Sequence, residues 1–324
     1  MKNSPLKIFI TGASGFVGAA ITRHLKDKHQ ITAMARSDKS QAKVIQAGAE
    51  AIRCDLFNIT KAHLEGVDIV IHSAARAEEW GSYHDFYQAN VIGTQNMLAA
   101  AKAANVKRFI FVGTEAAMFK GQEMINIDER YPYAFDSPFP YSKTKAQAEK
   151  MVLSENSEAM QTLSLRPRLV WGPNDESVLP AILEMIEKGT FAWVADGQAE
   201  TSTTYIGNFV HAIELALNKG KSGNAYFIAD NETGTIKHFF SQLIETTNTA
   251  VPTKSLPGVL VRSAARVIDV TWNVFGIKTQ PPLSRFAAAM MSRSCTLNIE
   301  KAKQELSYEP VYSVEEGLRV MSAS

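Results

Sequence analysis

The sequence has little cysteine, almost no net charge and no long uninterrupted apolar run. Its 324 residues include two cysteines, Cys54 and Cys295, which cannot build a disulfide framework and do not form a C-x-x-C pair. We therefore expect reduced, structural thiols and a cytoplasmic protein. With 34 Lys+Arg against 33 Asp+Glu and no basic stripe, the charge pattern argues against nucleic-acid binding. No stretch reaches the roughly 18 uncharged apolar residues of a membrane-spanning helix, and the N-terminus leaves no room for a signal peptide before the first predicted strand.

What the sequence does contain is an alternation of short β-branched runs with longer helical patterns over the first 230 residues. Such alternation predicts an α/β fold in which a doubly wound parallel sheet is covered on both faces. The predicted helices are residues 16–27, 84–104, 141–155 and 207–217. The predicted strands are residues 7–11, 31–35, 51–54, 68–73, 108–113, 163–166 and 225–229.

The regular alternation of strands and helices ends after Arg166, where RPRLVWGPND carries two prolines and a glycine. We expect the chain to leave the sheet twice after this point. We expect residues 1–170 plus 206–230 to form the sheet domain. Residues 171–205 plus 231–324 are expected to form a smaller, mostly helical substrate-binding lobe over the carboxyl edge of the sheet, where open α/β sheets bind ligands.

The first predicted strand ends in a glycine-rich turn, KIFITGASGFVG, at residues 7–18. Gly12 allows a tight turn, Gly15 allows the backbone to approach a pyrophosphate, and Gly18 allows the helix to pack close to the strand. The free N–H groups at the start of the helix favour phosphate. The turn predicts a dinucleotide site of the Rossmann type. Its candidate contacts are Gly12, Ala13, Ser14, Gly15, Phe16, Val17 and Gly18.

The end of the second strand indicates which dinucleotide is bound. An acidic residue there would bind a ribose 2′-hydroxyl, but the chain has Arg36 followed by Ser37. A guanidinium can pair with a 2′-phosphate, so NADP(H) is favoured over NAD(H). The alternatives are that Arg36 is only an exposed loop residue, or that Asp38 reaches back to the ribose.

Later strand ends supply the remaining candidate cofactor contacts. Asp55 could accept a hydrogen bond from an adenine amino group, or it could only cap the turn that follows it. We expect His72 to be packed rather than catalytic, and Asn90 to be a buried hydrogen-bonding residue. The further candidate contacts are Asp55, Leu56, Ser73, Ala74, Ala75 and Pro167.

The segment PYSKTKA places Tyr141 and Lys145 four residues apart, on one face of a predicted helix. A phenol with a pKa near 10 is a poor acid or base near neutral pH. A nearby ammonium favours the phenolate, so we expect Lys145 to lower the pKa of Tyr141. The lysine can also bind a cofactor ribose. The pair therefore predicts proton transfer by Tyr141.

With these motifs in place, the chain resembles an extended short-chain dehydrogenase/reductase over nearly its whole length. The resemblance rests on TGASGFVG, YSKTK, RPRLVWGP, YIGNFVHA and KAKQELSYEP. RPRLVWGP, a Trp-bearing apolar helix and PPLSRF resemble the 3β-hydroxysteroid dehydrogenase-like branch, which handles sterols, other hydrophobic alcohols or ketones, and β-keto or β-hydroxy acids. The resemblance also implies a homodimer through the helices at 84–104 and 141–155.

The resemblance also implies a hydroxyl residue after the fifth strand that hydrogen-bonds the reacting oxygen. The chain reads FVGTEAAMF there, where two serines are more usual. We assign this role to Thr114. A register shift of one residue would bring Glu115 to the site instead, and its carboxylate would repel a developing oxyanion.

The C-terminal third contains apolar segments suited to a hydrophobic small-molecule substrate. Residues 257–276 read as an amphipathic helix because Arg262, Arg266 and Asp269 interrupt them. This helix either completes the core of the lobe or makes weak contact with a membrane surface. Candidate pocket residues, each of which could equally be ordinary packing, are Leu283, Phe286, Met290, Met291, Trp171, Trp193 and Tyr205.

The function predicted from these features is NADP(H)-dependent interconversion of a carbonyl and an alcohol on an apolar substrate, with Thr114, Tyr141 and Lys145 as catalytic residues. The first alternative is a nucleotide-sugar epimerase or dehydratase that retains tightly bound NAD. The second is a redox sensor that binds NADP(H) without catalysis. The pattern gives no reason to expect a metal.

Overall fold

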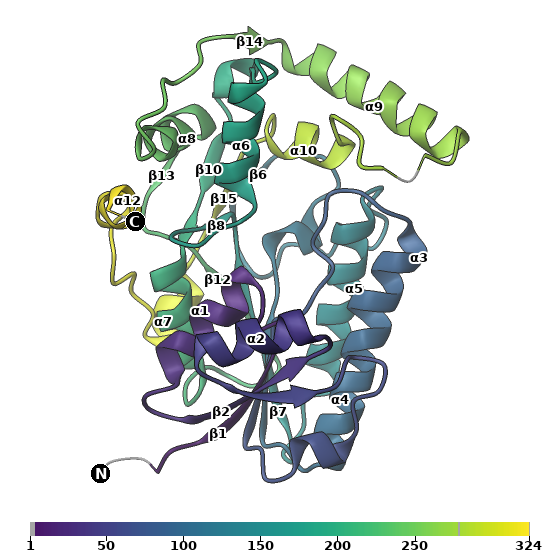
Figure 1. Cartoon of the computed structure of the whole chain (residues 1–324), viewed down its shortest axis with the longest axis vertical. Coiled ribbons are helices and arrows are strands. Elements are labelled where there is room, and N and C mark those ends of the chain that lie inside the picture. Colours follow the sequence, from purple (N-terminus) through teal and green to yellow (C-terminus); the bar gives the residue numbers. More distant parts are fainter. Residues whose placement is uncertain (1–3, 278, 324) are drawn as a thin grey trace.

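The computed structural model describes residues 4–277 and 279–323, and its centre is a seven-stranded sheet (Figure 1). All its strands are parallel, in the order β12-β7-β5-β4-β1-β2-β3. The order reverses between β1 and β4, which is the point where doubly wound sheets bind ligands. All seven predicted strands are confirmed. They are β1 (Lys7–Thr11), β2 (Gln30–Ala35), β3 (Glu50–Arg53), β4 (Ile69–His72), β5 (Arg108–Val112), β7 (Gln161–Pro167) and β12 (Asn224–Ile228).

Helices cover both faces of this sheet, as its continuously apolar strands require. Ile8, Ile10, Ile71 and Ile110 are completely buried in it. The helices α1, α2 and α7 pack together on one face, and α4 and α5 pack on the other (Figure 1). Their bounds are α1 (Phe16–Leu25), α2 (Asp38–Ala47), α4 (Gly93–Ala103), α5 (Pro140–Ser154) and α7 (Ile206–Ala216).

The single helix predicted over residues 84–104 is wrong in its detail. The structure has the short helix α3 (Tyr83–Phe86), then a π-helical stretch (Tyr87–Ile92), then α4. The side chain of Thr94, in the first turn of α4, donates a hydrogen bond to the carbonyl of Asn90 in the π-helical stretch at 2.6 Å. Such π-helical stretches are frequent at functional sites, and no feature of the apolar periodicity reveals them.

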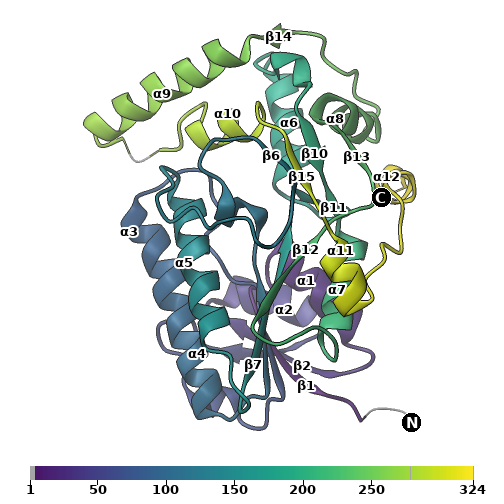
Figure 2. The ribbon, with the colours of Figure 1, turned by 180° about the vertical axis from the view of Figure 1, so that it is seen from behind.

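A second, four-stranded sheet lies beyond the carboxyl edge of the first, in the order β13-β10-β15-β6. Its strands are β6 (Met124–Ile127), β10 (Glu200–Ser202), β13 (Thr233–Thr235) and β15 (Cys295–Leu297). Its neighbouring helices are α6 (Val178–Glu187), α8 (Ile236–Glu245), α9 (Gly258–Val274) and α10 (Arg285–Met290). Figure 2 shows these elements from behind, with α9 and α10 above α3 and α5.

The remaining elements are short. The two-stranded pairs are β8 (Val170–Trp171) with β11 (Thr204–Tyr205), and β9 (Trp193–Val194) with β14 (Ser255–Leu256). The other helices are η1 (Lys61–Leu64), η3 (Glu115–Met118), η4 (Ala195–Gly197), α11 (Glu300–Leu306) and α12 (Val314–Ser322). Among the described residues, no helix combines the length and apolar character needed to span a bilayer. Cys54 and Cys295 are both buried and unoxidised.

Candidate active site

The glycine turn after β1 brings two loops into close approach. Gly12 has φ of +73°, and a Cβ atom there would lie 2.8 Å from the backbone nitrogen of Ala74. A Cβ atom on Gly18 would lie 2.3 Å from the carbonyl oxygen of Gly12. A Cβ atom on Gly15, by contrast, would have no neighbour closer than the Gly12 carbonyl oxygen, at 3.5 Å. Gly12 and Gly18 are thus required by the fold, whereas Gly15 leaves room for a ligand.

The helix that begins at this turn has an uncapped N-terminus. Gly15 is the N-cap residue of α1 and supplies no side-chain hydrogen bond, and the first turn of α1 carries no acidic residue. The N–H of Gly15 donates to the carbonyl of Gly12 at 3.0 Å, but the N–H groups of the first turn of α1 are open to an anion and are reinforced by the helix dipole. This geometry fits a pyrophosphate, which residues 12–18 would hold.

A buried hydrogen-bond chain fixes the adjoining ends of β1 and β4. Thr94 donates to the Asn90 carbonyl, so it accepts from Nε2 of His72 at 3.0 Å. The other ring nitrogen, Nδ1, then accepts from the hydroxyl of Thr11 at 2.7 Å. Burial lowers the pKa of His72 to about 3, so the ring is neutral. His72 is packed, as predicted, and Thr11 in turn accepts from the backbone N–H of Ala74 at 3.0 Å.

The residues predicted to bind the cofactor ribose and adenine lie at the ends of β2 and β3. Arg36 is exposed at the end of β2. Ser37 is the N-cap of α2 and accepts from the backbone N–H of Ser40 at 3.2 Å. Asp38 is paired with Arg53 at 2.7 Å, which favours Arg36 over Asp38 as the residue that decides cofactor preference.

Asp55 makes the contacts of a turn cap. Its Oδ1 accepts from the backbone N–H groups of Phe57 at 2.7 Å and Asn58 at 3.0 Å. The carbonyl of the adjoining Leu56 accepts from Asn96. A role toward adenine is therefore left to the other carboxylate oxygen of Asp55.

The other predicted contacts lie along the loop after β4 and at the end of β7. Ser73, Ala74 and Ala75 follow β4 directly, and Gly12 packs against the first two. Asn90, which is buried, holds this loop by bonds to the backbone N–H and carbonyl of Arg76 at 2.7 and 3.1 Å. Pro167 is buried at the last position of β7.

Tyr141 and Lys145 begin α5, whose first residue is Pro140. Thr114 lies close enough to the phenol of Tyr141 to lower the pKa of Tyr141. The Nζ of Lys145 donates to the carbonyl of Val112 at 2.7 Å and lies 4.1 Å from the ring centre of Phe111. Burial lowers the pKa of Lys145 to about 8. The structure thus brings Thr114 near Tyr141, with Lys145 one helical turn further along α5.

The predicted lowering of the pKa of Tyr141 by Lys145 is wrong: the pKa is raised, and Lys145 is not among the groups that shift it. Burial raises the pKa of Tyr141 above its usual range, and the carboxylate of Glu115 raises it further. The hydrogen bond with Thr114 acts in the opposite sense but is the smaller effect. The sequence did not reveal that the phenol would be desolvated beside a carboxylate. Tyr141 is therefore a protonated phenol at neutral pH.

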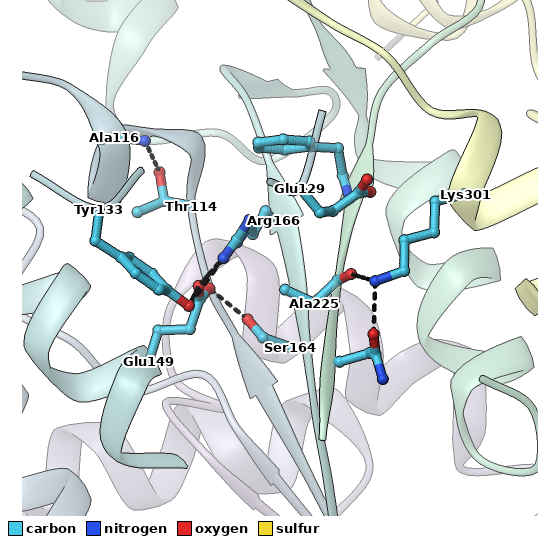
Figure 3. A network of polar contacts seen from close by, with 11 residues as sticks. Thr114, Ala116, Glu129, Tyr133, Glu149, Ser164, Arg166, Ala225 and Lys301 are labelled. Carbon is cyan, nitrogen blue, oxygen red and sulfur yellow. Dashed lines mark hydrogen bonds and ion pairs between the residues drawn. The ribbon is translucent and has the colours of Figure 1, made fainter. Parts of the chain in front are cut away.

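Figure 3 shows a buried polar network around Glu149 and Arg166, in the same view as Thr114. Glu149, which is completely buried on α5, accepts from Nε of Arg166 at 2.8 Å, from Tyr133 at 2.7 Å and from Ser164 at 2.7 Å. Burial alone would raise the pKa of Glu149, but Arg166 lowers it overall. A Cβ atom on Gly113 would lie 2.4 Å from Glu149, so glycine is needed for β5 to reach this network.

A second buried ion pair flanks the candidate catalytic residues. Nη1 of Arg168 lies 2.6 Å from Oε1 of Glu115, and both side chains are at most 4% exposed. Thr114 donates to Oε2 of Glu115 at 2.9 Å. Arg168 is held in turn by Thr201 of β10 at 3.0 Å. Sequence reasoning considered Glu115 only as a register alternative and missed Arg168, although Arg168 is part of RPRLVWGP.

A cavity of about 170 Å³ opens beside Tyr141. Phe286 of α10 packs edge-on against Tyr141, with ring centres 6.0 Å apart. Glu79, Asp269 and Arg285 add charge to the cavity wall, and the last two are paired at 3.1 Å. The aromatic residues that line it are Trp80, Tyr83, Phe86, Phe139, Tyr141 and Phe286.

Of the pocket residues proposed from the sequence, Phe286 lines this cavity. Trp171, Trp193 and Tyr205 are at most 5% exposed and pack in the hydrophobic core, which is the ordinary-packing alternative. Leu283 packs against the small cluster under α9, and Met290 and Met291 pack against the main core. Trp80 and Phe139 were missed, because no periodic pattern marks them as pocket residues.

Comparison with known proteins matches this architecture. The 3-beta hydroxysteroid dehydrogenase/isomerase family matches residues 9–257. A 2-alkyl-3-oxoalkanoate reductase of Stenotrophomonas maltophilia (strain K279a) is 34% identical, over 98% of this chain and 99% of that protein. A 4-hydroxy-2-methyl-3-oxo-4-farnesyl-3,4-dihydroquinoline-1-oxide ketoreductase of Stigmatella aurantiaca is 32% identical, over 97% of this chain and 95% of that protein.

Solved structures agree. The crystal structure of gox2253 superimposes with a TM-score of 0.80 at 25% identity, covering 99% of this chain and 97% of that chain. The UDP-glucuronic acid 4-epimerase from Bacillus cereus in complex with NAD superimposes with a TM-score of 0.76 at 20% identity, covering 98% of both chains, and shows a shared fold. The chain therefore belongs to the 3-beta hydroxysteroid dehydrogenase/isomerase family and is an NAD(P)-dependent enzyme of the extended short-chain dehydrogenase/reductase type.

Proposed function

We propose that this enzyme interconverts a carbonyl and an alcohol on an apolar substrate with NADP(H), and that Tyr141 donates or accepts the proton. The observation that carries the proposal is the placement of Tyr141. This residue lines a cavity that is walled mainly by aromatic side chains. A protonated phenol in that place suits the donation of a proton to a carbonyl oxygen.

Each catalytic residue has a distinct task. When bound, the reduced nicotinamide supplies the hydride that the carbonyl carbon receives. Tyr141 gives its phenolic proton to the carbonyl oxygen. Thr114 orients the Tyr141 hydroxyl, and the ammonium of Lys145, fixed on the Val112 carbonyl, presents positive charge behind it. With a pKa of about 8, Lys145 is largely protonated at neutral pH.

The cofactor preference proposed is NADP(H) over NAD(H). Support comes from the exposed Arg36 at the end of β2 and from the pairing of Asp38 with Arg53. A 2′-phosphate suits a guanidinium, whereas an NAD-specific site usually has an acidic residue there. The residues proposed to hold the remainder of the cofactor are those of the glycine turn with Ser37, Asp55, Leu56, Ser73, Ala74, Ala75, Lys145 and Pro167.

The proposed substrates are hydrophobic ketones, of which 2-alkyl-3-oxo acids are our first candidates. Support comes from the aromatic wall beside Tyr141 and from the 34% identical 2-alkyl-3-oxoalkanoate reductase. We propose that the substrate lies between the sheet domain, residues 1–170 plus 206–230, and the lobe of residues 171–205 plus 231–324. A nucleotide-sugar epimerase would normally retain tightly bound NAD, and the exposed Arg36 at the end of β2 weighs against that alternative.

The test is NADPH oxidation with 2-alkyl-3-oxo acids of increasing chain length, followed at 340 nm. We expect kcat/KM to rise with chain length, because each buried methylene contributes about 0.8 kcal/mol. Tyr141→Phe should lower kcat by a factor of about 10² to 10⁴ while NADPH binding is retained. Full turnover by Tyr141→Phe would overturn the proposal. Purified protein that carries tightly bound NAD would favour the epimerase alternative, and an NADP(H)-dependent change in partner binding without turnover would favour the sensor.

We further propose that α9 makes weak contact with a membrane surface. Val267 and Val274 of this helix are 66% and 74% exposed, and Phe275 beside them is 75% exposed. Co-sedimentation with anionic vesicles should fall when Val267→Glu is combined with Val274→Glu. A homodimer through α4 and α5 is proposed from the family resemblance and is tested by the mass in solution. A cytoplasmic location is proposed from the two free, buried cysteines.

A further inference from the structure

A second cavity, the sheet-edge cavity, lies toward the end of α5 that is remote from Tyr141. It has a volume of about 300 Å³ and is lined by residues of α5, β12 and α11, among them Lys150, Leu153, Ala225 and Lys301. Lys150 follows Tyr141 by nine residues, which is roughly 13 Å along the helix axis. Among the described residues, none lines both this cavity and the one beside Tyr141. The sheet-edge cavity is therefore a separate place in the molecule.

We propose that the sheet-edge cavity is a second binding site, which takes a small organic carboxylate and holds it through Arg166 and Lys301. This site is additional to the proposed reaction and does not depend on the role of Tyr141. Three features point to such a ligand: an unpartnered nitrogen of Arg166, a surplus of positive charge, and an apolar wall.

Arg166 presents a buried donor that the chain itself does not use. The residue is 2% exposed and lines the sheet-edge cavity. Its Nε donates to Glu149 at 2.8 Å, and its Nη2 donates to Glu149 at 2.5 Å and to the hydroxyl of Tyr133 at 2.9 Å. Its Nη1 has no hydrogen-bond partner among the described residues. A buried donor without a partner is costly, so the two N–H groups of this nitrogen favour an acceptor.

The unused nitrogen is directed away from Glu149. A guanidinium is planar, with its nitrogens spread evenly around the central carbon, so a carboxylate on Nε and Nη2 leaves Nη1 facing another way. Figure 3 shows Glu129 and Lys301 on the side of Arg166 that is opposite Tyr133 and Glu149. Both residues line the sheet-edge cavity. The free nitrogen thus faces the part of the wall that Glu129 and Lys301 form.

Lys301 brings a second, fixed positive charge to the cavity. Its Nζ donates to the side chain of Asn224 at 2.7 Å and to the carbonyl of Ala225 at 3.1 Å, so the ammonium is held in place. Burial lowers the pKa of Lys301, Glu129 raises it, and the charge of Arg166 lowers it again. Arg166 and Lys301 therefore repel each other across the cavity, and an anion bound between them would relieve this repulsion.

The charges around the cavity suit a monoanion. Its wall carries three cations, Lys150, Arg166 and Lys301, and one carboxylate, Glu129. Glu149, which is paired with Arg166, is the second carboxylate of this group. Three positive and two negative groups leave one positive charge, which a single carboxylate neutralises.

The same cavity offers a surface for a short carbon chain. Leu153 of α5 and Ala225 of β12 line it, together with the ring of Tyr133. Apolar side chains beside a few convergent polar groups are the usual composition of a small-molecule site. A chloride or phosphate ion would leave this apolar wall unused, so an organic carboxylate fits the cavity better than an inorganic anion.

The first test is calorimetric titration of the NADPH-saturated enzyme with butyrate. Bound NADPH fills the anion site that is proposed at the glycine turn. The comparison ligands are 1-butanol, which has the same chain without the charge, and inorganic phosphate, which has charge without a chain. We expect both to bind at least about tenfold more weakly than butyrate. Equal binding of 1-butanol would show that the charge is not recognised, and equal binding of phosphate would indicate an adventitious ion only. Either result would overturn the inference.

Two variants locate the binding. Lys301→Met removes one of the cations, and Ser154→Glu places a carboxylate at the exposed rim of the cavity. Each should weaken butyrate at least about tenfold and leave NADPH affinity and kcat unchanged, because neither residue contributes to the proposed reaction. Since Ser154 is exposed, its variant tests the site even if Lys301→Met loosens α11. Lys303→Met, also on α11 but paired with Glu300 at 3.3 Å outside the cavity, is the matched control.

A crystal structure of the NADPH complex with butyrate completes the test. We expect the carboxylate within hydrogen-bond distance of Nη1 of Arg166 and the chain against Leu153. Butyrate found only beside Tyr141, or an affinity for butyrate that neither variant changes, would overturn the inference and leave the proposed function intact. Conversely, full turnover by Tyr141→Phe would remove the proposed function without affecting this site.

Discussion

Lys145→Met should make the free protein more stable while it abolishes turnover. The ammonium of Lys145 is 3% exposed, and burial lowers its pKa from 10.5 to about 8. That difference means that the buried charge lowers the free energy of unfolding by roughly 3 kcal/mol below pH 8. The variant leaves the Val112 carbonyl without its donor, at a cost of about 1 kcal/mol. We therefore expect a net gain of about 2 kcal/mol at pH 7.5.

The sign of the pH dependence follows from the two states of Lys145. Between pH 8 and 10.5 the unfolded chain keeps the proton that the folded protein has released, so the stability of the wild type rises with pH. Because methionine does not titrate, the Lys145→Met variant lacks this dependence of stability on pH. The advantage of Lys145→Met should therefore shrink by about 1.4 kcal/mol for each pH unit above 8, and should largely disappear by pH 9.5.

The assay is urea unfolding followed by circular dichroism at pH 7.5 and pH 9.5, with wild type and variant measured side by side. Lys150→Met, on the same helix but exposed, is the matched control and should differ from the wild type equally at both pH values. A Lys145→Met protein that is less stable than the wild type at pH 7.5, or a stability difference that is the same at both pH values, would refute the reasoning.

The other predictions concern the turn, the cofactor choice and the polar network. Gly15→Ala should keep the melting temperature, because its Cβ would lie 3.5 Å from the nearest atom, but its methyl group should lower the affinity for NADPH. Gly18→Ala should unfold the turn, because its Cβ would lie 2.3 Å from a carbonyl oxygen. Thermal melts measure the stability of each variant, and calorimetric titration measures its NADPH affinity. Arg36→Glu should weaken the binding of NADPH at least about tenfold and leave the binding of NADH unchanged, as measured by calorimetry. A wild-type protein that binds NADH more tightly than NADPH would contradict this prediction. Arg166→Met should destabilise the protein by about 3 to 5 kcal/mol in urea, because it leaves Glu149 buried and unpaired.

Much of the fold was predictable because its signals are local. The strands of a sheet buried on both faces are continuous apolar runs, such as residues 7–11 and 108–113, and the glycine turn follows the first of them directly. The π-helical stretch within 84–104 was not predictable, since it leaves the apolar periodicity almost unchanged. The second sheet was missed because its strands have only three or four residues each.

The site was predictable only in part for the same reason. Tyr141 and Lys145 are four residues apart, so their common face follows from helix geometry. The pairing of Glu115 with Arg168 joins residues 53 positions apart and depends on how η3 meets the segment that follows β7. The pKa of Tyr141 was predicted in the wrong direction because its burial is a property of the assembled lobes.

The two arginines around Pro167 explain how one short segment organises the whole site. Arg166 holds Glu149, and so fixes the middle of α5. Arg168 holds Glu115, and so fixes the orientation of Thr114. Loss of the first pair should act on Lys145, whose charge Glu149 favours from one helical turn away, and loss of the second should act on the phenol. Each ion pair therefore acts on a different titrating group. A variant of the Arg166–Glu149 pair should change the titration of Lys145 only, and a variant of the Arg168–Glu115 pair should change that of Tyr141 only.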